Sequence, residues 1–292
     1  MSKENGLFRP GEYFKPTSIN EAVKLLAQYG EKGMTIAGGT DVLATKNPQI
    51  EVLIDITGLG LNYIKSDSQG LRIGAATTLA DIEISPVLSK GPYNIIARAA
   101  HKVGTPLIRN LGTIGGNLCN ASPSADTPPP LLALGAKLKL VSSKQSREMP
   151  LDEFFAAPFR TVKEYDELLT EIVLPPLTPG TGTSYQWLTK ISSIDESLVA
   201  VAVMVILGNK GEVIEDARIG LISVAPTPMR ARQAEEMLRG KNVKDGLIEV
   251  VAKAVADETR PRSRPDYRRN MSAVLTERAI REAVAQAKGA AS

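Results

Sequence analysis

Two glycine-rich segments carry the residues of this sequence best suited to chemistry. The first is Thr-Ile-Ala-Gly-Gly-Thr-Asp at 35–41, and the second is Gly-Thr-Ile-Gly-Gly-Asn at 112–117. Each joins adjacent glycines to a threonine, so backbone N–H groups stand beside a hydroxyl without a Cβ to shield them. Several oriented donors of this kind suit the oxygens of a diphosphate. On the residues alone, a cradle for a diphosphate-containing cofactor and a pair of tight structural bends both remain open.

Other kinds of site are disfavoured by what the sequence lacks. Neither segment has the lysine of a P-loop or the G-x-G-x-x-G spacing of a simple dinucleotide fold. The chain of 292 residues has one cysteine, Cys119, and one histidine, His101. These cannot form a Cys/His zinc site, an iron–sulfur cluster or an internal disulfide framework. A Ser-His-Asp triad would need His101 as its base.

Charge and hydropathy favour a globular protein without nucleic acid or a membrane span. Lysine and arginine number 35 against 32 acidic residues, and aromatic residues make up only 4%. A nucleic-acid binder would show a larger basic excess and more aromatic side chains. The start of the sequence is polar, and the longest apolar run, 198–207, is too short to cross a bilayer. We therefore expect a soluble, cytoplasmic protein.

The glycine segments lie among predicted helices and strands. Ser18 and Gly30 bracket a helix over 19–29. Strands are predicted over 34–37, 52–56, 71–75, 136–141 and 168–174, and helices from Thr78, over 93–102 and over 131–134. The stretch 104–130, rich in Gly, Asn, Ser and Pro, is predicted to be functional or disordered.

A Pro-, Gly- and Thr-rich linker over 177–182 predicts a domain boundary. Beyond it, strands over 197–207 and 213–222 flank Gly208-Asn209-Lys210-Gly211, which is typical of a hairpin turn. Helices are predicted over 230–239, 246–258 and 267–287.

Several motifs together resemble one family. Residues 37–41, 108–117 and 121–128, with 220–230 and 267–278 beyond the linker, are similar to the FAD-binding medium subunit of the molybdenum hydroxylases, including the xanthine dehydrogenase and carbon monoxide dehydrogenase groups. The resemblance implies an α+β fold. A two-lobed FAD-binding domain of the PCMH type would span 1–176, with the lobes meeting near 57–62. A C-terminal domain of antiparallel sheet plus helices would span 183–292.

The resemblance also implies a site for non-covalent FAD. The first segment would wrap the diphosphate with Thr35, Ile36, Ala37, Gly38, Gly39, Thr40 and Asp41. The second wall would be Thr113, Ile114, Gly115, Gly116 and Asn117. Val103, Gly104 and Thr105 would approach the isoalloxazine ring, and Asp126 would bind the ribose or polyol. Leu169 would touch the flavin or pack in the core.

A few residues have two interpretations each. Relatives carry a lysine where this chain has Gln186 or Trp187, so Trp187 is expected to cover the flavin or Lys190 to supply the charge, with a core tryptophan as the alternative. His101 is expected at a surface or helix end rather than as a covalent tether. Cys119 is expected as a small buried apolar residue. The arginine-rich stretch 260–269 fits either a solvated helix entrance or a contact with partner subunits.

The implied function is electron transfer within a complex. In the family, a large subunit holds the molybdenum cofactor and a small subunit holds [2Fe–2S] clusters. This chain's FAD would collect their electrons and pass them to an external acceptor. No side chain of this chain would need to act as a general acid or base. The implied assembly is a dimer of heterotrimers. The alternatives are a stand-alone flavin-dependent oxidoreductase and a non-catalytic nucleotide-binding scaffold.

Overall fold

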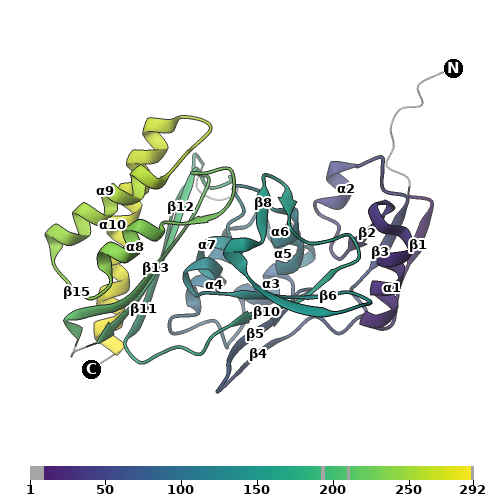
Figure 1. Ribbon diagram of the computed structural model, residues 1–292, viewed down its shortest axis with the longest axis horizontal. Coiled ribbons are helices and arrows are strands. Elements are labelled where there is room, and N and C mark those ends of the chain that lie inside the picture. Colours follow the sequence, from purple (N-terminus) through teal and green to yellow (C-terminus); the bar gives the residue numbers. More distant parts are fainter. Residues whose placement is uncertain (1–9, 192–194, 209–210, 291–292) are drawn as a thin grey trace.

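The computed structural model describes residues 10–191, 195–208 and 211–290, arranged as three parts along its longest axis (Figure 1). The first part spans 10–56, the middle part 64–174 and the third part 181–290. The three parts combine helices with sheets that are mostly antiparallel, which confirms the α+β fold. Among the described residues, no helix is both long and apolar enough to cross a membrane.

The first part is a small parallel sheet with a helix. Its strands are β1 (Glu12–Phe14), β2 (Gly33–Ile36) and β3 (Val52–Asp55), in the order β1-β3-β2. Helix α1 (Ile19–Tyr29) has the predicted bounds, since the Ser18 hydroxyl accepts from the N–H of Glu21 and Gly30 ends it with φ at 53°. A 3₁₀ turn (Gly30–Lys32) and the short helix α2 (Val42–Thr45) complete this part.

The middle part is a five-stranded antiparallel sheet with helices on one side (Figure 1). The strands run in the order β4 (Ile64–Asp67), β5 (Gly70–Gly74), β10 (Leu168–Leu174), β6 (Lys137–Val141) and β7 (Ser146–Pro150). The helices are α3 (Leu79–Glu83), α4 (Asn94–Lys102), α5 (Pro106–Leu111), α6 (Ile114–Asn120) and α7 (Pro128–Ala133). A 3₁₀ turn (Leu151–Glu153) and the hairpin of β8 (Phe155–Ala157) and β9 (Arg160–Thr161) lie before β10.

Disorder, one of the two expectations for the stretch 104–130, is wrong. The stretch 104–130 contains α5, α6 and the start of α7. Thr105 and Thr113 cap α5 and α6, their hydroxyls accepting from the N–H groups of Ile108 and Gly116. These caps overcome the poor helix propensity of the glycines and prolines.

The third part is the predicted antiparallel sheet packed by helices. Its strands are β11 (Thr181–Leu188), β12 (Val199–Gly208), β13 (Val213–Ile222), β14 (Met229–Arg230) and β15 (Lys241–Asn242). Its helices are α8 (Arg232–Leu238), α9 (Asp245–Glu258) and α10 (Pro265–Ala290). The predicted turn between β12 and β13 lies partly outside the described residues.

Strand β12 joins the middle and third parts because both of its faces are buried. Val201 and Val203 pack in the core beneath α8, α9 and α10, whereas Ala202 and Met204 pack in the core of the middle part. This alternation follows the two-residue period of a strand. The contact is close, since a Cβ on Gly220 of β13 would lie 2.4 Å from the carbonyl oxygen of Pro129 in α7.

Candidate functional site

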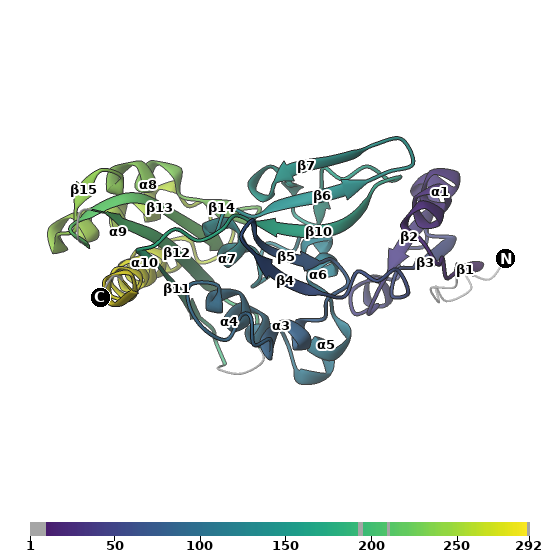
Figure 2. The ribbon, with the colours of Figure 1, turned by 90° about the horizontal axis from the view of Figure 1, so that it is seen from below.

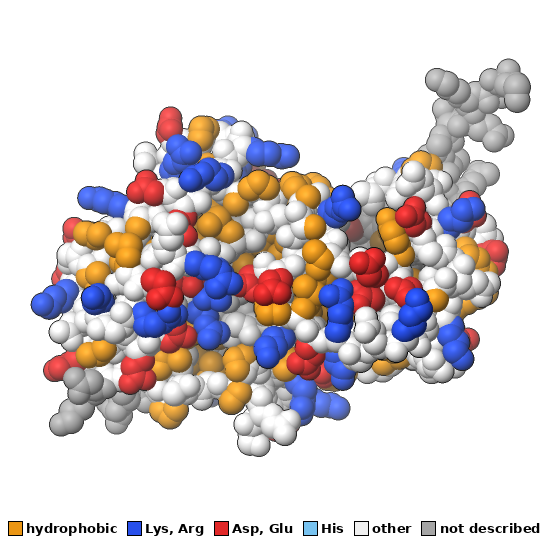
Figure 3. Space-filling view, viewed as in Figure 1, with side chains coloured by type: hydrophobic (Ala, Val, Ile, Leu, Met, Phe, Trp, Pro, Cys, Tyr) orange, Lys and Arg blue, Asp and Glu red, His pale blue; other side chains and the backbone are white. Residues whose placement is uncertain are grey.

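A cleft of about 1090 Å³ lies between the first and middle parts and reaches the third. The face drawn in Figure 3 is hollowed between the first two parts. The cleft is lined by the first glycine segment, by α6, by the chain between β8 and β10 and by Asp195 and Glu196. Ligand sites commonly measure about 300–1,000 Å³, so this cleft has room for a dinucleotide-sized cofactor.

The first glycine segment forms a tight turn after β2. A Cβ on Gly38 would lie 1.7 Å from the carbonyl oxygen of Leu111, so only glycine allows this approach to α5. Gly39 has φ at 71°, in the left-handed region that glycine favours. Within the described residues, the backbone N–H groups from Gly38 to Asp41 donate to no protein acceptor. A run of free N–H groups beside a cleft is an anion-binding arrangement.

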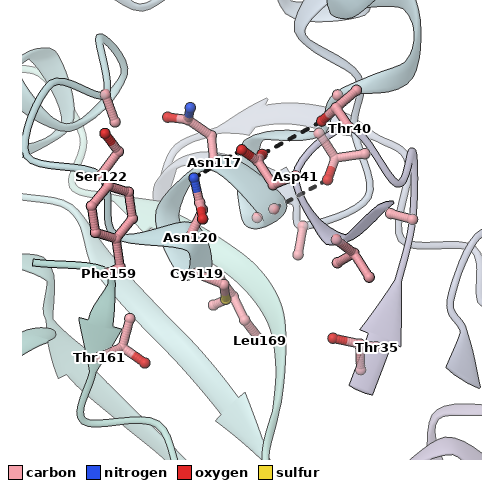
Figure 4. A pocket seen from close by; sticks show the side chains of 18 of the residues that line it. Thr35, Thr40, Asp41, Asn117, Cys119, Asn120, Ser122, Phe159, Thr161 and Leu169 are labelled. Atoms are coloured by element: carbon pink, nitrogen blue, oxygen red, sulfur yellow. Dashed lines mark hydrogen bonds between the residues drawn. The ribbon is translucent and has the colours of Figure 1, made fainter. Parts of the chain in front are cut away.

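Asp41 ties this turn to α6 rather than pointing a free carboxylate at a ligand. Its Oδ1 accepts from the Asn120 side chain at 2.9 Å, and its Oδ2 accepts from the Thr40 hydroxyl at 3.5 Å (Figure 4). Burial raises the pKa of Asp41, and the hydrogen bond from Thr40 opposes that rise. Of the other predicted residues here, Thr35 and Ala37 line the cleft beside the turn.

The second glycine segment is the first turn of α6, and most of its N–H groups are occupied. Those of Ile114 and Gly115 donate to the carbonyl oxygens of Thr77 and Ala75, at 3.0 and 2.9 Å. That of Gly116 donates to the Thr113 hydroxyl at 3.1 Å. At these positions the backbone N–H groups donate within the protein, so any contact of this segment with a ligand would come from other atoms. The cause is that α6 packs directly on the chain leaving β5.

What α6 presents to the cleft is small residues and amides. Thr113, Gly115, Gly116 and Asn117 line the cleft, whereas Ile114 is fully buried in the core. A Cβ on Gly115 would lie 2.6 Å from the Ala75 carbonyl oxygen, so this glycine is required by packing.

Asp126 is a buried carboxylate at the far side of the cleft. It is 5% exposed, and its Oδ1 accepts from the hydroxyls of Ser197 at 2.6 Å and Tyr185 at 2.9 Å. Burial raises its pKa, against the opposing effect of those two hydrogen bonds. Its Oδ2 has no partner among the described residues and is not fully enclosed, so it can accept from a ligand hydroxyl.

Val103 and Gly104 form the cleft wall that follows α4. Both line the cleft, and Gly104 has φ at 52°. Leu169, 3% exposed on β10, is part of the core and also lines the cleft, so its contact with a flavin stays a prediction. Thr105 instead caps α5 with its hydroxyl.

A partly buried ion pair fixes the Val103–Gly104 wall. The Arg109 side chain donates to the carbonyl oxygens of Val103 at 3.4 Å and Gly104 at 3.1 Å, and it pairs with Glu83 at 2.6 Å. His101 also contacts Glu83, at 2.7 Å, from an exposed position in the last turn of α4. The surface position predicted for His101 is thus confirmed.

Lys102 is a cleft residue that sequence reasoning missed. It lines the cleft, is 4% exposed, and donates from Nζ to the carbonyl oxygen of Asp195 at 2.7 Å. Of the two residues expected at this place, Trp187 packs on Tyr185 and Arg98, and Lys190 has an exposed side chain. Neither is among the described residues that line the cleft. Lys102 is the last residue of α4, and nothing in the sequence at this position indicated that its side chain is buried.

The chain between β8 and β10 forms a wall that the sequence did not reveal. Phe159 and Thr161 face the cleft opposite Thr35 and Thr40 (Figure 4). Phe159 is 64% exposed and has φ at 59°, an uncommon conformation for a bulky residue.

Cys119 lies in α6 with its side chain toward the cleft, partly buried, and burial raises the pKa of its thiol. In the described ranges, no three His, Cys, Asp or Glu side chains come together as a metal site. The donors present are backbone N–H groups, amides and hydroxyls, with a carboxylate and an ammonium group at the far side. Such a set fits an extended organic cofactor with a diphosphate and hydroxyl groups.

Comparison with known proteins gives the same assignment. Residues 8–177 match the model of the FAD binding domain in molybdopterin dehydrogenase, and residues 188–283 match that of the CO dehydrogenase flavoprotein C-terminal domain. The glyceraldehyde dehydrogenase medium chain of Sulfolobus acidocaldarius is 33% identical over 92% of this chain and 97% of its own length. The carbon monoxide dehydrogenase medium chain of Hydrogenophaga pseudoflava is 31% identical over 94% and 97%.

Solved structures agree in fold. A chain of carbon monoxide dehydrogenase from Hydrogenophaga pseudoflava superposes with a TM-score of 0.89 at 32% identity, covering 95% of this chain and 98% of that one. A chain of quinoline 2-oxidoreductase from Pseudomonas putida 86 gives 0.86 at 26% identity, covering 96% and 99%. This chain belongs to the family of FAD-binding medium subunits of the carbon monoxide and xanthine dehydrogenase type, which transfer electrons within molybdenum hydroxylase complexes.

Proposed function

We propose that the cleft holds FAD non-covalently, with its diphosphate on the turn from Gly38 to Asp41. The observation that carries this proposal is the run of N–H groups at that turn for which the described residues provide no acceptor. A diphosphate there would accept from them, and the absence of a Cβ at Gly38 and Gly39 allows a close approach. Thr35, Thr40 and Asn117 would add side-chain contacts from the cleft walls.

The remaining walls would orient the rest of the cofactor. Asp126, with its Oδ2 available, would accept from a ribityl or ribose hydroxyl. Val103 and Gly104, held by Arg109, would lie against the isoalloxazine ring, with Leu169 beside it. Lys102 would place a positive charge at this end of the cleft. When bound, FAD supplies two-electron redox chemistry that it exchanges one electron at a time with metal centres.

The chain would act with two partner subunits in a dimer of heterotrimers, located in the cytoplasm. A large subunit would hold the molybdenum cofactor, and a small subunit would hold the [2Fe–2S] clusters. The proposal is supported by the relatives' designation as medium chains of dehydrogenases. The domains would span 1–176, with lobes divided near 57–62, and 183–292.

The test is to purify the chain alone and together with its partner chains. We expect a yellow protein that releases one FAD per chain on denaturation. Organic substrates should leave the isolated chain oxidised, and they should bleach its flavin only in the complex. A colourless chain that FAD does not reconstitute would overturn the cofactor assignment, and bleaching of the isolated chain by an organic substrate would overturn the electron-transfer role.

A further inference from the structure

The short helix α5 exposes an apolar ridge. Leu107, Ile108 and Leu111 are 76%, 41% and 56% exposed, and we name them the α5 ridge. Their spacing places them on one side of the helix. Arg109 points the other way, where it is 7% exposed and pairs with Glu83 of α3. No exposed residue of α5 carries a charge.

Two further exposed apolar side chains follow helix α3, which packs against α5. Helix α3 is joined to α5 by the ion pair between Glu83 and Arg109, and it leads directly into Ile84, which is 75% exposed. Val87, which follows shortly, is 40% exposed. Large apolar side chains scattered singly on a surface need no explanation, but a contiguous exposed apolar patch marks an interaction site, and the α5 ridge gathers three such side chains on one short helix.

The ridge borders the cofactor cleft. Ile108 lines the cleft as well as the ridge, and a Cβ on Gly104 would lie 3.2 Å from its side chain. At the other end of α5, the carbonyl oxygen of Leu111 meets the turn at Gly38. Any protein seated on the ridge would therefore lie beside the Val103–Gly104 wall of the cleft.

We infer that the α5 ridge is the docking surface for the iron–sulfur subunit. This inference rests on the proposed function, in which the flavin ring lies against Val103 and Gly104. Electron tunnelling slows steeply with distance, so the subunit that supplies electrons must sit close to the ring, and the ridge is an exposed apolar surface adjoining that end. An uncharged ridge also suits the dry centre of a lasting interface. A second copy of this chain seated there would bring no electron donor.

The position of the ridge separates it from other candidate contacts. Figure 2 shows α5 at the edge of the middle part, away from α8, α9 and α10 of the third part. The arginine-rich stretch 260–269 belongs to that third part. Changes to the ridge can therefore be tested without altering the arginine-rich surface.

The experiment uses the complex, co-expressed with its iron–sulfur and molybdenum chains, with Leu107→Glu and Leu111→Glu combined in this chain. The matched control is Val250→Glu on α9, where the apolar side chain is 54% exposed. Native mass spectrometry would give the subunits present. Bound FAD per chain, the melting temperature and the rate of flavin reduction by a reduced iron–sulfur chain would be measured alongside.

We expect the double variant to keep its FAD and fold, to bind the iron–sulfur chain about 100-fold more weakly, and to lose rapid flavin reduction. The control should assemble normally. Full assembly of the double variant would overturn the inference, as would loss of only the molybdenum chain or of only self-association. If the double variant fails to fold, Leu107→Ser with Leu111→Ser decides by the same readouts. Absence of FAD from the wild-type chain would instead refute the proposed function.

Discussion

The contact between Gly38 and Leu111 gives the sharpest prediction. In Gly38→Ala the new Cβ would stand 1.7 Å from the Leu111 carbonyl oxygen, whereas ordinary contact begins at 3.4 Å. The turn and α5 would have to separate by roughly 1.7 Å (3.4 − 1.7), and because the obstructing atom is backbone, no side-chain rotation relieves it. Overpacking of this kind costs about 1–3 kcal/mol, and we take the upper part of that range.

This displacement should appear in FAD affinity. A cost of about 2–3 kcal/mol corresponds to a dissociation constant raised about 30- to 150-fold. Quenching of flavin fluorescence on titration measures it, and thermal unfolding without FAD shows whether the fold persists. The matched control is Gly58→Ala, also near the first part, where the nearest atom to the new Cβ would be the flexible end of Lys15 at 3.7 Å. Unchanged FAD affinity in a folded Gly38→Ala variant would refute the assignment of this turn to the cofactor.

Three further predictions concern charged residues. The pKa of Asp126 is raised in the folded chain, so this carboxyl group destabilises the fold as the pH rises above 3.8. Asp126→Asn should therefore raise the melting temperature of the FAD-free chain at neutral pH. This increase should become smaller as the pH is lowered. Burial acts to raise the pKa of Glu83, but hydrogen bonds from His101 and Arg109 outweigh it and leave that pKa below 4.5. Glu83→Gln should therefore cost about 1–3 kcal/mol in urea unfolding at neutral pH, and the difference should vanish as pH falls below 4.5; a constant difference would contradict this. Lys102→Met should weaken FAD binding about tenfold in the same titration, whereas Lys190→Met should not.

Elements fixed by local interactions could be predicted from the sequence. The bounds of α1 follow from Ser18 and Gly30, and those of β10 from a largely apolar segment ended by Pro175. The site could be predicted where the signal is also local, as at Gly38 and Gly39, whose backbone conformation and close packing require glycine.

The rest of the site depends on contacts between distant segments. Gly115 resembled a ligand-binding glycine, yet it is required by Ala75, forty positions earlier. Lys102 became a cleft residue through the carbonyl oxygen of Asp195. Phe159 reaches the cleft because the β8–β9 hairpin folds back against α6. The N–H of Phe159 donates to the carbonyl oxygen of Ala121 at 2.9 Å. No spacing within one segment carries that information.

The strand order of the middle sheet has a consequence for biosynthesis. Strand β10 is the last of the five to leave the ribosome, yet it lies between β5 and β6 at the centre of the sheet. Until Leu168–Leu174 has emerged, β5 and β6 each keep an unpaired edge, and such edges invite aggregation. Leu169 of the cleft arrives on that same strand, so a nascent chain that ends before it has an incomplete cofactor site. The cleft is therefore completed only when this strand has joined the sheet.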